Sequence, residues 1–222
     1  MADTKAHQRY RLKPTPKFPK GEIVPGVTTI IDSQLGWNKR VLMAWTRREA
    51  LAGQDPEKLK EEAGDSGTCT HRLVEAHIKR VEADLKDFTA NQINKAETGF
   101  LAFLDWEKEN KLEYVGLEFQ VVSESLRYGG TIDILARKNS SLWQVDLKTS
   151  KGIWPEMKVQ VAAYNYAYEE QEGKHIDECH LLQLNKEDGS FQHHKLSREQ
   201  IDDGLEVFLA CRKLYDIQKR FK

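Results

Sequence analysis

The spacing of the apolar residues changes near residue 111, and this change restricts the possible folds more than any other feature of the chain. Upstream, apolar side chains recur every three or four positions, as in amphipathic helices; they are Leu73, Val74, Ile78, Val81 and Leu85, then Ile93, Phe100, Leu101 and Leu104. Downstream, every second residue is apolar at Val115, Leu117, Phe119 and Val121, as in a half-buried strand. The sequence therefore predicts helices followed by a sheet.

Turn residues divide the region after the first strand into further elements, beginning with Tyr128-Gly129-Gly130. The pattern predicts, in order, strands at 131–137 and 142–148, a helix at 156–170, strands at 180–184 and 191–195, and a last helix from Ser197. Short links between the first strands favour an antiparallel meander, and the later helix is a crossover. We therefore expect an α/β fold, with a central mixed, largely antiparallel sheet flanked by helices and an N-terminal helical region.

The chain is long enough for one sizeable core, so we predict a single domain over residues 1–222. Its parts are a flexible basic arm at 1–22, a mainly helical part at 24–110, the sheet with its crossover helix at 111–196, and a C-terminal helix at 197–222. Within the helical part, residues 24–31 lean toward a strand, and residues 53–65 read as a polar, mobile segment that could contain a short helix at 56–62. That segment and the basic arm are candidates to gate a cleft.

Charge, cysteine content and hydropathy exclude several classes of protein. The formal net charge is −1, so the chain as a whole is not a basic protein that coats nucleic acid. Its three cysteines are scattered, which argues against a disulfide framework, a zinc site or an iron–sulfur cluster and favours a reducing, cytoplasmic setting. We expect no membrane partner, because no apolar run is long enough to cross a bilayer and none has the form of a secretory signal.

Acidic residues interrupt the apolar strands, and their spacing predicts a cation site. Asp146 and Lys148 lie two residues apart on one strand and therefore share a face. If the strands form a meander, Asp133 can lie beside Asp146, with Glu118 on the strand before. Neighbouring carboxylates on a partly buried surface repel each other unless a cation or a proton lies between them. Carboxylate oxygens with an adjacent lysine favour Mg²⁺ or Mn²⁺ over zinc.

These residue types supply what phosphodiester hydrolysis needs. Asp133 and Asp146 would be carboxylate ligands of the ion, and the backbone carbonyl of Leu147 could add another oxygen. Lys148 would orient the attacking water and offset charge on the phosphoryl oxygens. Glu118 could bind a metal-bound water or a second ion, and a neutral His71 imidazole could complete the coordination shell.

The order of these motifs resembles that of the PD-(D/E)XK nuclease superfamily, and within it the RecB-like exonuclease branch. The matching segments are Gly67-Thr68-Cys69-Thr70-His71, Glu118, Gly130-Thr131-Ile132-Asp133, Val145-Asp146-Leu147-Lys148-Thr149-Ser150, and Gln160 with Tyr164. Residues 24–31 resemble the Pro-x-Val-Thr-Thr-Ile opening of phage-type and mitochondrial genome-maintenance exonucleases. Ile132 stands where the superfamily's proline would be, as is usual in the RecB-like branch, and the iron–sulfur cysteines of some relatives are missing.

The resemblance implies a restriction-endonuclease-like core and metal-dependent cleavage of DNA, often single-stranded or from an end. It implies that His71 and both aspartates bind metal and that Lys148 is catalytic. It also implies that the segment after Lys148 and the following helix contact substrate; the candidate residues there are Thr149, Ser150, Trp154, Gln160 and Tyr164. Trp154 could stack on unpaired bases. The expected setting is replication, repair or recombination in a bacterial cell or a phage-infected host.

Structural alternatives stand beside these assignments. Gln160 and Tyr164 lie one helical turn apart and could simply pack the helix on the sheet, Glu118 could be a solvated strand residue, and Trp154 could belong to the core. The leading function is an exonuclease acting on DNA ends. The alternatives are a structure-selective endonuclease on the same scaffold and a catalytically inert module that only binds nucleic acid.

Overall fold

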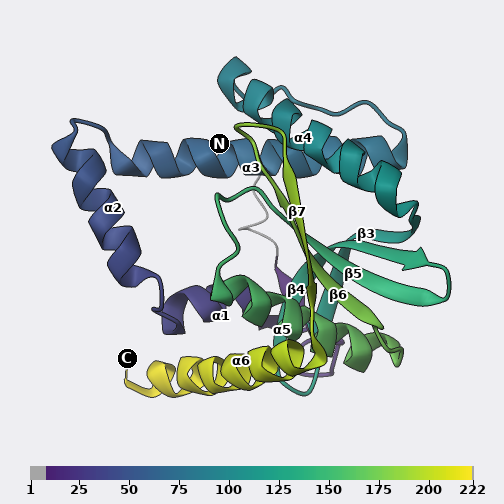
Figure 1. Ribbon diagram of the computed structural model, residues 1–222. Helices are drawn as coiled ribbons and strands as arrows, with labels where there is room; N and C mark the ends of the chain where they lie inside the picture. Colours follow the sequence, from purple (N-terminus) through teal and green to yellow (C-terminus); the bar gives the residue numbers. More distant parts are fainter. Residues whose placement is uncertain (1–8, 222) are drawn as a thin grey trace.

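The computed structural model describes residues 9–221 of the 222-residue chain. Its elements are β1 (Tyr10–Arg11), β2 (Ile23–Val24), α1 (Val27–Gln34), α2 (Lys39–Leu51), α3 (Pro56–Lys79), α4 (Ala90–Asn110), β3 (Glu113–Ser123), β4 (Tyr128–Lys138), β5 (Ser141–Lys148), α5 (Pro155–Glu172), β6 (Glu178–Leu184), β7 (Phe191–Leu196), α6 (Arg198–Gln218) and the 3-10 helix η2 (Lys219–Phe221). Figure 1 shows a sheet between two groups of helices. The predicted fold class is confirmed.

The main sheet has five strands in the order β3-β4-β5-β6-β7. Its first three strands form the predicted antiparallel meander, and β6 and β7 are also antiparallel. Only β5 and β6 run parallel, because α5 crosses over between them. The sheet is therefore mixed and largely antiparallel, and the end of β5 lies beside β6 rather than at an edge.

Helices cover both faces of this sheet (Figure 1). On one face, α1, α5 and α6 pack around a core that includes Ile30, Val161 and Phe208. On the other face, α3 and α4 pack around Phe103 and Trp106. Because both faces are covered, the middle strands are buried along most of their length, and a charged side chain there needs a partner.

The first long helix begins earlier than its hydrophobic spacing indicates. Residues 53–65 were expected to be a mobile segment with at most a short helix at 56–62, but α3 runs without a break from Pro56 to Lys79. The Asp55 side chain accepts hydrogen bonds from the backbone N–H groups of Glu57 and Lys58, and Pro56 fits the first helical turn. The expectation was wrong because a cap and packing partners, and not the apolar stripe alone, decide where this helix begins.

The segment at residues 24–31 is also different from its prediction. Only Ile23–Val24 is a strand, and the β-branched run from Val27 forms the helix α1. Val27, Ile30 and Ile31 lie on one face of that helix and are buried against α5 and α6. Burial of this face outweighs the weak preference of β-branched residues for strands.

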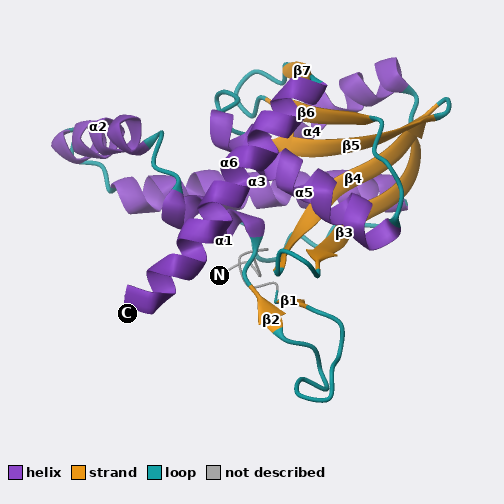
Figure 2. Cartoon of the chain, turned by 90° about the horizontal axis from the view of Figure 1, so that it is seen from below, coloured by secondary structure: helices purple, strands orange, loops and turns teal. Residues whose placement is uncertain are grey.

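Part of the predicted flexible arm has regular structure. Tyr10 pairs with Val24 and Arg11 with Ile23 in a two-stranded antiparallel ribbon, and Figure 2 shows the loop that joins these strands projecting from the body of the protein. Residues 1–8 of the predicted arm lie outside the described residues. No helix within residues 9–221 is long and apolar enough to cross a membrane.

Candidate active site

Strands β4 and β5 diverge at the level of Asp133. Their backbone pairing ends with Ile134 opposite Val145. At the next level the Asp133 side chain replaces the backbone of β4 as the acceptor, and its Oδ2 accepts a hydrogen bond of 2.8 Å from the Leu147 backbone N–H. The Asp133 side chain is only 7% exposed. A buried carboxylate therefore lies in the gap between the two strands, held there by one backbone donor.

The neighbouring strand has an irregular backbone at the same level. Glu118 has φ +48°, which is uncommon for a residue other than glycine. Its neighbours Leu117 and Phe119 pack on opposite faces of the sheet, although strict alternation would place them on the same face. The left-handed backbone at Glu118 accounts for this change of face, and it brings the Glu118 carboxylate toward Asp133.

The histidine reaches this cluster because α3 passes close to the end of β5. At Gly67, a Cβ atom would lie 2.7 Å from Thr149 Oγ1, so a larger residue here would displace the Thr149 hydroxyl or the helix. One turn further along α3, His71 Nδ1 lies 3.5 Å from Asp133 Oδ1. In the Gly-Thr-x-x-His segment, Gly67 therefore allows α3 to lie close to the end of β5, and this closeness brings His71 to Asp133.

His71, Glu118 and Asp133 each offer a ligand atom, and these atoms lie within 4.8 Å of one another. Two carboxylates and one imidazole form a donor set of hard oxygens and a nitrogen, which suits a divalent cation. Glu118 was expected from the sequence to bind a metal-bound water or a second ion, and not to belong to the same cluster as His71 and Asp133. The structure places Glu118 in the closest cluster and places Asp146 beside it.

Asp146 is paired with the lysine of its own strand. Lys148 Nζ lies 2.6 Å from Asp146 Oδ2, and the two side chains are 16% and 2% exposed. Burial raises the pKa of the Asp146 carboxyl, and the Lys148 ammonium opposes that shift while Asp133 adds to it. The pair lies on the α5 side of β5, so Asp146 and Lys148 share a face as their spacing predicts.

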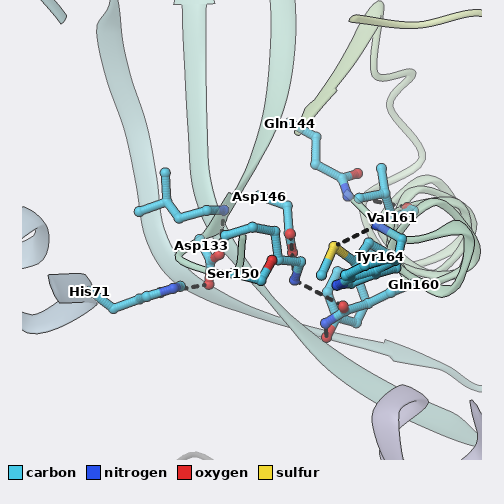
Figure 3. Close-up of polar contacts among 12 residues, drawn as sticks. His71, Asp133, Gln144, Asp146, Ser150, Gln160, Val161 and Tyr164 are labelled. Atoms are coloured by element: carbon cyan, nitrogen blue, oxygen red, sulfur yellow. Dashed lines mark hydrogen bonds and ion pairs between the residues drawn. The ribbon is translucent and has the colours of Figure 1, made fainter. Parts of the chain in front are cut away.

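A chain of hydrogen bonds fixes the position of Lys148. Its Nζ donates to Gln160 Oε1 at 3.0 Å, and Gln160 Nε2 donates to the Tyr164 hydroxyl oxygen at 2.7 Å. The Tyr164 ring lies against the backbone of Gly130, where a Cβ atom would be 2.2 Å from its Cε1. The Gln-x-x-x-Tyr pair of α5 therefore packs the helix on the sheet and also orients the lysine. Figure 3 shows His71 reaching Asp133 from one side and Gln160 and Tyr164 lying on the other.

These groups open into one cleft of about 420 Å³. Of the predicted site residues, it is lined by His71, Asp133, Asp146, Leu147, Lys148, Thr149, Ser150, Gln160 and Tyr164. Ser150 is held by a hydrogen bond of 2.7 Å that Gln183 Nε2 donates to its backbone carbonyl oxygen. Trp154 does not line this cleft; it is 45% exposed and lies at the start of α5. The core alternative for Trp154 is therefore wrong.

The cleft contains residues that sequence reasoning missed, namely Tyr10, Thr28, Thr131 and Met157. Tyr10 comes from the supposed arm, and its hydroxyl lies 3.0 Å from Thr131 Oγ1. A Cβ atom at Gly129 would lie 2.4 Å from the Tyr10 side chain. The glycine pair at 129–130, which reads as a turn in the sequence, is instead where two tyrosines contact the backbone of β4 from α5 and β1.

The mixed sheet, the cluster of His71, Glu118 and Asp133, and the Asp146–Lys148 ion pair together are typical of metal-dependent nucleases. This chain belongs to the PD-(D/E)XK nuclease superfamily, whose family model matches residues 42–218. The predicted superfamily is thereby confirmed. No curated protein matches the chain by sequence.

Two solved structures illustrate how far the likeness extends. A candidate exonuclease from Eubacterium rectale is 10% identical, with a TM-score of 0.47, and the match covers 65% of this chain and 64% of that one. The LHK-Exo structure in complex with dAMP is 13% identical, with a TM-score of 0.37, covering 72% of this chain and 89% of that one. The chain thus spans less than two thirds of the Eubacterium rectale protein.

Proposed function

We propose that this protein is a metal-dependent DNA exonuclease that hydrolyses phosphodiester bonds from ends, prefers single-stranded DNA, and acts in replication, repair or recombination. The observation that carries the proposal is the position of Lys148. Its ammonium lies between the Asp146 carboxylate and the Gln160 amide, in the cleft that also contains His71 and Asp133. The preference for ends and for single strands is supported by the RecB-like order of the sequence motifs.

The metal would be Mg²⁺ or Mn²⁺, held by His71, Glu118 and Asp133, with the Asp146 carboxylate and the Leu147 carbonyl as further oxygen donors. The fit rests on the chemistry of the cluster, because carboxylates that converge within 4.8 Å are costly without a cation. When bound, such an ion polarises the scissile phosphate and lowers the pKa of a water molecule.

The chain's own groups complete the proposed reaction. The Lys148 ammonium orients the attacking water and offsets negative charge on the phosphoryl oxygens. Gln160 and Tyr164 hold the lysine in place through their hydrogen-bond chain, so they are positioning residues. Thr149 and Ser150 line the cleft directly after β5, and the Thr149 hydroxyl can donate to the DNA backbone. The Ser150 hydroxyl donates to the Gly152 carbonyl at 2.7 Å, so it would meet the DNA as an acceptor or after giving up that bond.

Digestion of labelled DNA tests this function. Linear single strands, linear duplexes and a circular single strand are incubated with Mg²⁺ and then Mn²⁺, with the Lys148→Ala variant as control. The expected result is metal-dependent loss of linear single strands, with the circle intact. Cleavage of the circle would identify the alternative, a structure-selective endonuclease. DNA binding without cleavage under every condition would identify an inert binding module, and either result would overturn the exonuclease proposal.

A further inference from the structure

An apolar groove of about 390 Å³ lies between the start of α5 and the projecting helix α2. Three of its wall residues are tryptophans, and its lining includes Trp37, Val41, Leu42, Trp45, Trp154 and Glu156. The volume lies within the roughly 300–1,000 Å³ that is usual for ligand pockets. A groove with this aromatic content is suited to flat, apolar ring systems.

The helix that forms one wall of the groove has little covering of its own. None of the 13 residues of α2 is buried, and Figure 2 shows the helix standing away from the sheet. Trp37 is 54% exposed and Val41 is 63% exposed. A helix of roughly 12–15 residues is marginal in water without packing partners. The apolar face of α2 is therefore expected to gain stability from an occupant of the groove.

The groove is continuous with the active-site cleft. A smaller hollow between them shares Asn38, Trp154 and Glu156 with the groove. The same hollow shares Lys148 and Gln160 with the cleft. The groove and the cleft therefore adjoin through this hollow, within reach of a single strand that places one phosphate at Lys148.

We propose that the groove binds unpaired bases of the same DNA strand whose phosphate lies at Lys148, a proposal that rests on the nuclease function. Bases would stack on the tryptophans, as they do on aromatic side chains in single-strand-binding proteins. Exposed Lys39, Arg40 and Arg47 on α2 can meet the phosphates between the bases. In duplex DNA the bases are stacked on one another, so the groove selects single strands.

Glu156 adds a polar contact to this apolar groove. Both of its carboxylate oxygens are buried, and neither has a hydrogen-bond partner among residues 9–221. A buried acceptor without a donor is unfavourable, so an occupant with donor groups is favoured over a purely apolar one. The amino groups of cytosine and adenine are such donors, and a carboxylate is a suitable acceptor for them.

Binding measurements on the full chain test the proposal. The probe is a short dye-labelled single strand, and its affinity is measured by anisotropy with a chelator present so that no cleavage occurs. Trp37→Ala and Trp154→Ala are each expected to weaken binding roughly 5- to 150-fold. Trp154→Phe keeps an aromatic ring and is expected to recover most of the loss. The matched control is Met43→Ala, because Met43 is a 71% exposed apolar residue of α2 outside the groove, and its affinity should equal that of the unaltered protein.

A strand with abasic sites separates base stacking from phosphate binding. The unaltered protein should bind the abasic strand more weakly than the intact strand, and Trp37→Ala/Trp154→Ala should not distinguish the two. Equal affinity of the tryptophan variants and the unaltered protein, or equal losses on intact and abasic strands, would overturn the proposal. Cleavage assayed in parallel separates the two hypotheses. If the protein cleaves DNA and the tryptophan variants bind the single strand as well as the unaltered protein does, only the role of the groove is refuted. If the protein binds DNA but never cleaves it, only the nuclease function is refuted.

Discussion

Gly130→Ala is the substitution that most directly tests whether Tyr164 positions Lys148, the lysine that we propose is catalytic. The added methyl group would lie 2.2 Å from Tyr164 Cε1 and 2.5 Å from its Cδ1. Carbon atoms in contact lie about 3.5–4.0 Å apart, so the ring must withdraw by about 1.3 Å or more. Tyr164 is only 5% exposed, and the open space next to it is the cleft that it lines, so the ring must move toward that cleft. The shift should break its 2.7 Å hydrogen bond with Gln160 and release Lys148.

Two magnitudes follow from this displacement. Overpacking a core costs about 1–3 kcal/mol, and in a protein of this size each kcal/mol lowers the Tm by about 2–4 °C, so the Tm should fall by about 2–12 °C. Misplacement of a catalytic group by about 1 Å can reduce the rate roughly 100-fold. We therefore expect kcat on a labelled single strand to fall roughly 100-fold, measured by quenched-flow or gel assay at saturating DNA below the lowered Tm.

The control is Gly64→Ala, which adds the same methyl group in α3 with no heavy atom within 4 Å. Alanine in a helix is favoured over glycine by about 0.5–1 kcal/mol, so this variant should melt slightly higher and cleave normally. In a Tyr164→Ala background the Gly130→Ala change should cost little, because the clashing ring is gone. If Gly130→Ala retains the unaltered Tm and kcat, the positioning role of Tyr164 is refuted.

Three further predictions concern titratable side chains. Lys148→Met should reduce cleavage at least roughly 100-fold in the digestion assay while leaving DNA affinity within a few-fold; normal cleavage would remove its catalytic role. Because burial raises the pKa of Asp146, its charged form destabilises the fold at neutral pH. Asp146→Asn should therefore raise the Tm in chelator and shrink the Tm gain on adding Mn²⁺, and a lower Tm in chelator would contradict this. Burial lowers the pKa of His180 to about 3, so stability should fall as the pH drops below about 6.5, where the unfolded chain gains a proton that the folded protein excludes. His180→Leu should flatten this dependence in melting curves from pH 7 to pH 5, and an unchanged slope would exclude His180 as its source.

The sequence by itself determined the elements whose spacing is local. The alternation around Asp146 put Lys148 on the same face, and the structure pairs them at 2.6 Å. The start of α6 is local in the same way: the Ser197 hydroxyl accepts a hydrogen bond from the Gln200 backbone N–H, and the Gln200 side chain accepts one from the Ser197 backbone N–H. The last helix therefore begins at Ser197, as predicted. Strand and helix periods fix which face a side chain takes, and a cap fixes where a helix begins, because both depend on neighbours within one turn.

Only the tertiary structure decided which residues meet across elements. His71 and Asp133 are 62 positions apart in the numbering, and their contact depends on the close approach of α3 to β5 at Gly67. The left-handed backbone of Glu118, which turns its carboxylate toward the cluster, has no local signature. Tyr10 joins the cleft because β1 packs across Gly129, which sequence patterns read as part of a turn. Contacts of this kind depend on strand register and on the volume left between packed elements, and neither quantity is encoded in the spacing of residues along one segment.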